Sequence, residues 1–185
     1  ENTASREVVS SLIVGNSPGL QTFTGDVSLA AGSETTFSVT SVMTPATDEL
    51  HGWDSACYSQ IRMDGAATFS VADGATFVIT FGGDVGLESA WSEEGLSFDM
   101  VLVHGGVSPE LVNLSALSEN TRFAVTEEEG GVPALPVTIR TDNLYYTVEN
   151  SNLVLHGVLY VTPEPATATL SLLALAGLAM RRRRK

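Results

Sequence analysis

The sequence predicts an all-β body followed by a short apolar C-terminal segment, and three observations support this prediction. Apolar and polar positions alternate over residues 7–42 and 65–83, with Gly, Asn or Asp as interruptions roughly every eight to twelve residues. Apolar residues recur at helical spacing only over the short segment 108–120. Finally, residues 166–180 are apolar and uncharged.

The expected strands share β-branched or aromatic residues in alternation and a turn signal at one or both ends. They are 12–14, 20–24, 27–29, 36–39, 67–71, 76–81, 96–104, 121–126, 137–141, 144–149 and 153–161. Residues 149–152, Glu-Asn-Ser-Asn, predict a hairpin turn between the last two strands.

A weak internal repeat bears on how these strands are arranged. Residues 25–32 resemble residues 65–71 in layout, because each begins at a glycine and is followed by a turn and a Thr-Phe pair. Repetition of a strand-turn-strand unit favours a β-solenoid. Strands at this spacing also occur in a β-sandwich of the jelly-roll kind, so both architectures stay open.

Two irregular acidic segments, 43–60 and 84–95, interrupt the strand pattern and are expected to be loops. The one predicted helix covers 108–120. Ser108 can cap its N-terminus and Pro109 suits its first position. Leu111, Leu114 and Leu117 would lie on a single face.

Composition and charge limit the function of the body. A chain of 185 residues with 43% hydrophobic residues holds one ordinary domain, predicted over residues 1–160. The net charge of −13 argues against a partner bound through its phosphates, so no nucleic acid is expected. The single cysteine, Cys57, excludes an internal disulfide framework. Because the sequence begins at Glu1, we expect it to be the C-terminal part of a longer chain.

The C-terminal segment, residues 161–185, has three parts in a fixed order. The first is Pro163-Glu164-Pro165, which ends the folded body because prolines interrupt strands and helices. The second is a predicted membrane helix over 166–180, with leucines at positions 170, 172, 173, 175 and 178. At about 1.5 Å per residue it reaches roughly 22 Å, which is short for a bilayer core. The third is the basic cluster Arg181, Arg182, Arg183, Arg184 and Lys185, expected to stay in the cytoplasm.

This tripartite segment resembles the PEP-CTERM sorting signal of Gram-negative bacteria. The resemblance implies export, transient anchoring in the inner membrane through Leu170, Leu172, Leu173, Leu175 and Leu178, and processing by an exosortase at Pro163, Glu164 and Pro165. It also implies that the protein is then either secreted or attached to the cell envelope, the outer surface or the exopolysaccharide matrix of a biofilm, with exopolysaccharide or surface glycans as candidate partners. The body itself resembles, more loosely, the C-terminal part of autotransporter-like adhesin repeats over residues 8–83.

Residues with catalytic or metal-binding chemistry do not form a motif in the body. His51, His104 and His156 are far apart in the sequence, and none has a ligand partner at helical or hairpin spacing. Cys57 has only His51 as a candidate base nearby in sequence. The acidic groups at 48–54 and 127–129 match no calcium-binding pattern. We therefore expect no catalytic residues, no metal site and no cofactor.

Aromatic residues of the loops suggest one possible ligand. Trp53, Tyr58 and Trp91 could form a platform on which a sugar ring stacks. The sequence thus predicts a non-enzymatic, exported structural or adhesive protein of the cell surface or extracellular matrix. The alternative is a carbohydrate-binding or carbohydrate-active β-sandwich with the same sorting tail.

Overall fold

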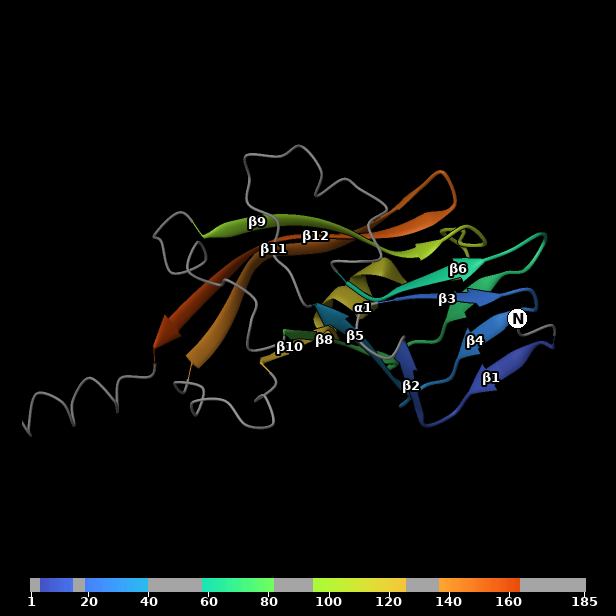
Figure 1. Ribbon diagram of the computed structural model, residues 1–185, viewed down its shortest axis with the longest axis horizontal. Helices are drawn as coiled ribbons and strands as arrows, with labels where there is room; N and C mark the ends of the chain where they lie inside the picture. The colour runs from blue at the N-terminus through green and yellow to red at the C-terminus, as the bar shows by residue number, and fades with distance from the viewer. Residues whose placement is uncertain (1–3, 15–18, 40–57, 82–94, 126–136, 164–185) are drawn as a thin grey trace, which may run out of the picture.

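A computed structural model describes residues 4–14, 19–39, 58–81, 95–125 and 137–163 (Figure 1). These residues form twelve strands and one short helix, α1, which confirms the all-β prediction with little helix. The strands are β1 Arg6–Val8, β2 Ser11–Val14, β3 Leu20–Phe23, β4 Val27–Leu29, β5 Glu34–Val39, β6 Gln60–Met63, β7 Phe69–Val71, β8 Thr76–Phe81, β9 Leu96–His104, β10 Arg122–Val125, β11 Val137–Glu149 and β12 Asn152–Pro163; the helix α1 is Leu114–Glu119.

The first nine strands form three sheets that the chain visits in turn. We call three consecutive strands a rung: β1, β2 and β3 form the first rung, β4, β5 and β6 the second, and β7, β8 and β9 the third. Each strand pairs in parallel with its counterpart in the next rung. The same spacing of 42 residues separates Val27 from Phe69, Glu34 from Thr76 and Ile61 from Val103.

The register corrects the alignment of the internal repeat. The strand β4 does pair with β7, as the similarity of the two segments suggests. However, Val27 lies opposite Phe69, whereas the sequence alignment places it opposite Ala67. The shift of two residues keeps the same faces buried, because side chains alternate with a period of two. Both Val27 and Phe69 are almost fully buried.

A long antiparallel hairpin extends the sheet that contains β3, β6 and β9. The strand β12 pairs with β9 on one side and with β11 on the other. The turn between β11 and β12 consists of Asn150 and Ser151, both at positive φ, as two-residue hairpin turns require. This confirms the predicted turn. The two strands expected at 137–141 and 144–149 are instead one strand with a bulge next to Asn143, whose φ is 53°.

The helix is shorter than predicted and begins later. Its N-cap is Asn113, whose side chain accepts a hydrogen bond from the Ala116 amide, and Ser108 does not cap it. Ser108 and Pro109 belong to a turn instead, closed by the Leu111 amide on the Ser108 carbonyl. Proline suits the second position of such a turn as well as the first turn of a helix, so the sequence pattern fits both.

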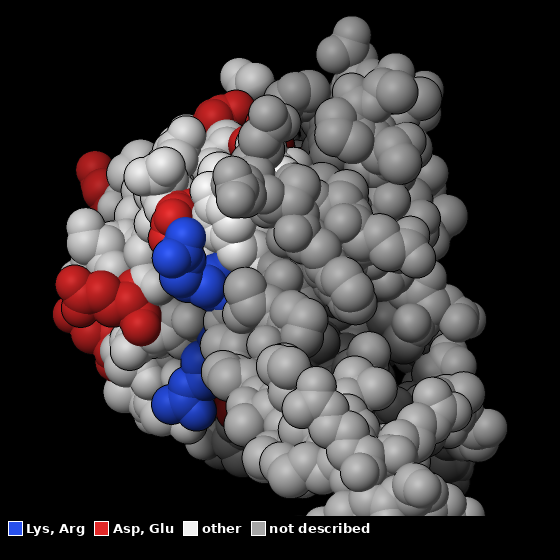
Figure 2. Space-filling view, turned by 90° about the vertical axis from the view of Figure 1, so that its left-hand side faces the viewer, with Lys and Arg blue, Asp and Glu red and all other residues white. Residues whose placement is uncertain are grey.

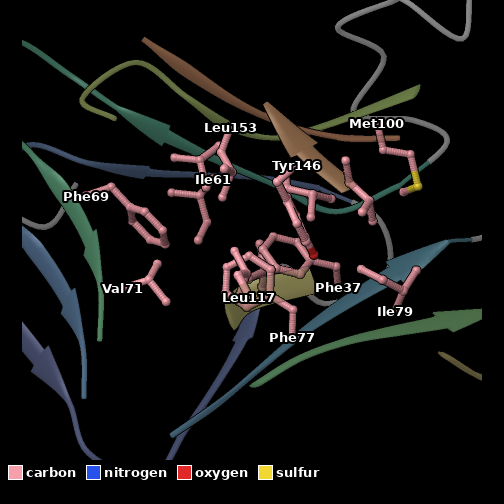
Figure 3. Close-up of a cluster of buried hydrophobic side chains, with 14 of the residues drawn as sticks. Phe37, Ile61, Phe69, Val71, Phe77, Ile79, Met100, Leu117, Tyr146 and Leu153 are labelled. Carbon is pink, nitrogen blue, oxygen red and sulfur yellow. The ribbon is translucent and has the colours of Figure 1, made fainter. Parts of the chain in front are cut away.

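The core lies between the three sheets, where alternate residues of each strand point inward (Figure 3). The strands β5 and β8 show this most clearly, with every second side chain buried. The largest fully buried side chains are Phe23, Phe37, Phe69, Phe77, Leu29, Ile61, Ile79, Leu102, Leu153, Leu155, Leu159 and Gln60. The helix α1 packs against β11 and contributes Leu117 to this core.

The last strand, β12, extends into the C-terminal segment 161–185. β12 ends at Pro163, which lies opposite Val137 of β11. The strand is therefore longer than the one predicted over 153–161. A proline is tolerated at a strand end because no ladder bond needs its missing N–H. Within the described residues, no helix is long and apolar enough to cross a membrane. The helix predicted over 166–180 lies outside the described residues.

Candidate functional site

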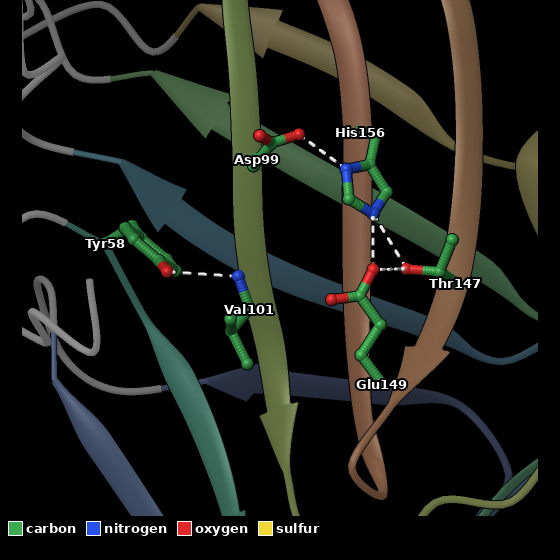
Figure 4. Close-up of polar contacts among 6 residues, drawn as sticks. All are labelled: Tyr58, Asp99, Val101, Thr147, Glu149 and His156. Carbon is green, nitrogen blue, oxygen red and sulfur yellow. Dashed lines mark hydrogen bonds and ion pairs between the residues drawn. The ribbon is translucent and has the colours of Figure 1, made fainter. Parts of the chain in front are cut away.

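One polar network joins the three strands β9, β12 and β11 (Figure 4). The strand register places Asp99 opposite His156, and His156 opposite Tyr145. The Nδ1 atom of His156 lies 2.5 Å from Oδ1 of Asp99. The Tyr145 ring stacks on the His156 ring, with centroids 4.7 Å apart. The imidazole is therefore held by its cross-strand neighbours on both sides, Asp99 on β9 and Tyr145 on β11.

The other nitrogen of the same ring faces Thr147 and Glu149 on β11. Nε2 of His156 lies 2.8 Å from Oγ1 of Thr147, and this hydroxyl lies 2.8 Å from Oε1 of Glu149. Thr147 has one hydroxyl proton, so it can donate to only one of these two partners. When both nitrogens of His156 bear a proton, Nε2 donates to Thr147 and Thr147 donates to Glu149, which satisfies every contact together.

The series Asp99, His156, Thr147 places an acid, an imidazole and a hydroxyl in a row, as in a nucleophile–base–acid triad. A nucleophilic hydroxyl would donate to the histidine, whereas Glu149 competes here for the Thr147 proton. We therefore interpret the network as a cross-link between three strands. The expectation that the body has no enzymatic activity stays a prediction.

A second group of polar residues lines a pocket of about 430 Å³. Among the described residues, the lining combines residues from β3, β6, β9 and β12 with two turn residues: Leu20, Gln60, Arg62, Met63, Asp64, His104, Gly105 and Asn152. Parallel pairing sets Leu20 beside Gln60 and Arg62 beside His104. We call this site the Gln60 pocket. Its residues come from four separate parts of the chain.

Two almost fully buried polar side chains, Gln60 and His104, contact each other in this pocket. Gln60 is 1% exposed and His104 is 3% exposed. Oε1 of Gln60 lies 3.1 Å from Nε2 of His104. Burial, reinforced by the positive charge of nearby Arg62, lowers the pKa of His104 to about 4. The imidazole is therefore neutral near pH 7.

This shift predicts a pH dependence of stability. Between about pH 6.5 and about pH 4 the unfolded chain binds a proton at His104 and the folded chain does not, so the free energy of unfolding falls as the pH falls through this range. We expect a loss of about 1–3 kcal/mol that His104→Gln abolishes. Urea unfolding of both proteins at pH 7 and pH 4.5 tests this. Equal losses in the two proteins would contradict it.

The residues singled out by the sequence are distributed as follows. Tyr58 is 5% exposed, and its hydroxyl accepts a hydrogen bond of 3.1 Å from the Val101 amide. A ring buried to this degree has no open face for a sugar. Trp53 and Trp91 lie outside the described residues, as do His51 and Cys57. Among the described residues, no three His, Cys, Asp or Glu side chains come close enough to hold a metal ion.

Sequence reasoning did not identify the Gln60 pocket; of its described lining residues it considered only His104, as a histidine without a ligand partner in the sequence. It treated residue 60 as the end of an irregular segment and predicted no strand over Gln60–Met63. The signal was present as the alternation of polar Gln60 and Arg62 with apolar Ile61 and Met63, but four residues are too few to distinguish a strand. Of the predicted Pro163-Glu164-Pro165 motif, the structure describes only Pro163, because residues 164–185 lie outside the described ranges.

Comparison with known proteins identifies the C-terminal segment alone. The family described as the PEP-CTERM protein-sorting motif matches residues 161–185. No curated protein matches the chain, and no solved structure matches it. The resemblance of residues 8–83 to adhesin repeats therefore has no support from these comparisons.

Proposed function

We propose that this protein is a structural or adhesive module of the cell surface or extracellular matrix, with a short β-solenoid as its body. The observation that carries the proposal is the PEP-CTERM motif at residues 161–185, which begins within the last residues of β12 and continues past the end of that strand. The motif implies exosortase-dependent sorting to the cell surface, with a membrane-transit step toward the envelope. An exosortase is thus a partner of this chain.

The pairing of the first nine strands supports the solenoid. Strands from successive rungs stack in parallel in each of three sheets, and the second and third rungs keep one spacing. A jelly roll is built from antiparallel strands. Among the described strands, antiparallel ladders form where β12 joins β9 and β11, and one isolated antiparallel bridge joins Val39 and Tyr58. In a solenoid each rung buries its inner face against its neighbours.

The two ends of the stack differ in a way that supports a role in contacts between molecules. At one end, Leu117 of α1 and Tyr146 of β11 are buried in the core. At the other end, the first rung and its turns expose Val9, Ile13 and Leu20, with Val9 and Ile13 each 68% exposed. Among the described residues, β1, β2 and β3 are terminal strands of their sheets, and exposed apolar side chains on terminal strands favour association with another surface.

The surface charge fits an exported body. Figure 2 shows acidic side chains spread over the described part of one face, and basic side chains in a smaller group. Residues 1–180 contain four arginines and no lysine, against 22 acidic residues. Such a body stays soluble and is repelled by anionic lipid surfaces. Residues 166–180 would anchor the body in the inner membrane during transit, and the basic cluster at 181–185 would stay on the cytoplasmic side of that membrane.

Replacement of the motif residues Pro163, Glu164 and Pro165 by alanine tests the sorting. We expect the variant to remain in the inner-membrane fraction of cells that contain an exosortase, because the processing enzyme no longer recognises its substrate. The parent chain should reach the envelope or the medium. The measurement is immunodetection of the body in each cell fraction.

The control for this experiment is Pro109→Ala, which removes a proline from a turn of the body and leaves the motif intact. It should fractionate like the parent chain. Release of the motif variant at the parent level would overturn the proposed sorting.

An adhesion assay tests the adhesive role. Cells that display the parent chain should adhere to exopolysaccharide-coated surfaces more strongly than cells without it, and equal adhesion would overturn that role.

A further inference from the structure

We propose that the Gln60 pocket binds a neutral sugar residue. The site differs from the aromatic platform expected from the sequence, since the one described member of that platform, Tyr58, is not among the described lining residues, and Trp53 and Trp91 lie outside the described ranges. The proposal goes beyond sorting and surface attachment, and it holds whether or not the body is adhesive. A pocket of about 430 Å³ lies within the range of roughly 300–1,000 Å³ that small-ligand sites occupy.

The side-chain amide of Gln60 is the first reason to expect a ligand. The residue is 1% exposed, and its carbonyl oxygen contacts Nε2 of His104. Its NH₂ group is buried and has no hydrogen-bond partner among the described residues. Leaving a buried donor unpaired is unfavourable, and a ligand oxygen in the pocket would satisfy it.

The charge balance of the lining favours a neutral ligand. The two formally charged residues of the described lining, Arg62 and Asp64, offset each other, since Nε of Arg62 lies 3.7 Å from Oδ1 of Asp64. The buried imidazole of His104 is neutral near pH 7. An anion would meet the Asp64 carboxylate and a cation would meet the Arg62 guanidinium. Hydroxyl groups, which both donate and accept hydrogen bonds, match this mixture of donors and acceptors.

A further amide and an apolar wall complete the match to a sugar. The Gly105 amide donates to Oδ1 of Asn152 at 2.9 Å, which orients the Asn152 side chain and leaves its NH₂ group as a second donor. Leu20 and Met63 supply apolar surface on the same lining. A sugar ring presents C–H groups on its faces and hydroxyl groups around its rim, so it needs both kinds of surface.

The test is a binding measurement on the full chain in a detergent that has no sugar head group. Glucose, galactose, mannose, N-acetylglucosamine and their disaccharides are titrated and followed by saturation-transfer NMR. Glucuronate and inorganic phosphate serve as anionic probes. We expect at least one neutral sugar to bind with a Kd of about 1 mM or tighter and to bind better than either anion.

Two pocket variants and one matched control locate the binding. Gln60→Leu removes the buried donor at similar size, and Arg62→Met removes the cation of the half-exposed pair. Each should weaken binding roughly tenfold or more. The control Arg122→Met changes an exposed arginine of β10 and should leave binding unchanged.

Three results would overturn the proposal. They are no binding of any neutral sugar, equal binding by the parent chain and both pocket variants, and preferential binding of an anion. If Gln60→Leu fails to fold, Arg62→Met decides the question alone, because its side chain lies at the surface.

Discussion

Phe77→Ala is expected to lower the free energy of unfolding by about 3–5 kcal/mol. Phe77 is fully buried on β8 and contacts aromatic residues of two other strands. Its ring centroid lies 5.2 Å from that of Phe37 on β5 and 6.1 Å from that of Tyr146 on β11. The side chain therefore links the stacked rungs to the hairpin, and its loss leaves a cavity at that junction (Figure 3).

Urea unfolding followed by far-UV circular dichroism measures this loss. The control is Val9→Ala, which shortens an apolar side chain that is 68% exposed and should change the stability by no more than about 0.5 kcal/mol. A loss below about 1 kcal/mol for Phe77→Ala would contradict the packing described here.

Gly106→Ala is expected to cost about 3 kcal/mol or more, through backbone and steric strain together. Gly106 has a φ of +68°, which L side chains rarely adopt. An added Cβ would lie 2.4 Å from the Ala67 carbonyl oxygen and 2.9 Å from Cβ of Met63. The Gly106 carbonyl also accepts a hydrogen bond from the Phe69 amide, so the turn cannot move without disturbing β7.

Gly65→Ala separates the two contributions. Gly65 has the same φ of +68°, but nothing lies within 4 Å of the position of an added Cβ. It should cost about 1 kcal/mol, from the backbone conformation alone. The stabilities of both variants, measured by the same unfolding experiment, should differ by about 2 kcal/mol. Equal costs would show that the rungs do not approach each other as closely at Gly106 as the structure indicates.

The parts of the fold that the sequence predicted are those whose local pattern matches their final environment. Strands β4, β5, β7 and β8 alternate regularly, and their inward residues are buried. β6 was missed because its alternation covers only four residues at the end of a segment whose sequence pattern is otherwise irregular. The helix boundary was wrong because Ser108 and Pro109 suit a turn as well as a helix start.

The candidate site could not be predicted, because it depends on register. Leu20, Gln60, His104 and Asn152 are distant in sequence and meet only through parallel stacking and the β9–β12 pairing. His156 likewise meets Asp99 through strand pairing, without any short motif. The sorting segment could be predicted, since its three parts are read along a continuous stretch of chain and need no tertiary contact.

The intact mass of the native protein, purified from fractionated cells, tests the central claim most directly. Because the claim is exosortase-dependent sorting through residues 161–185, the account predicts a C-terminus at or near Pro163–Pro165 and recovery outside the inner membrane. Residues 166–185 should be missing from this species and present in cells without an exosortase. A chain that still ends at Lys185 and stays in the inner membrane of exosortase-containing cells would contradict the account.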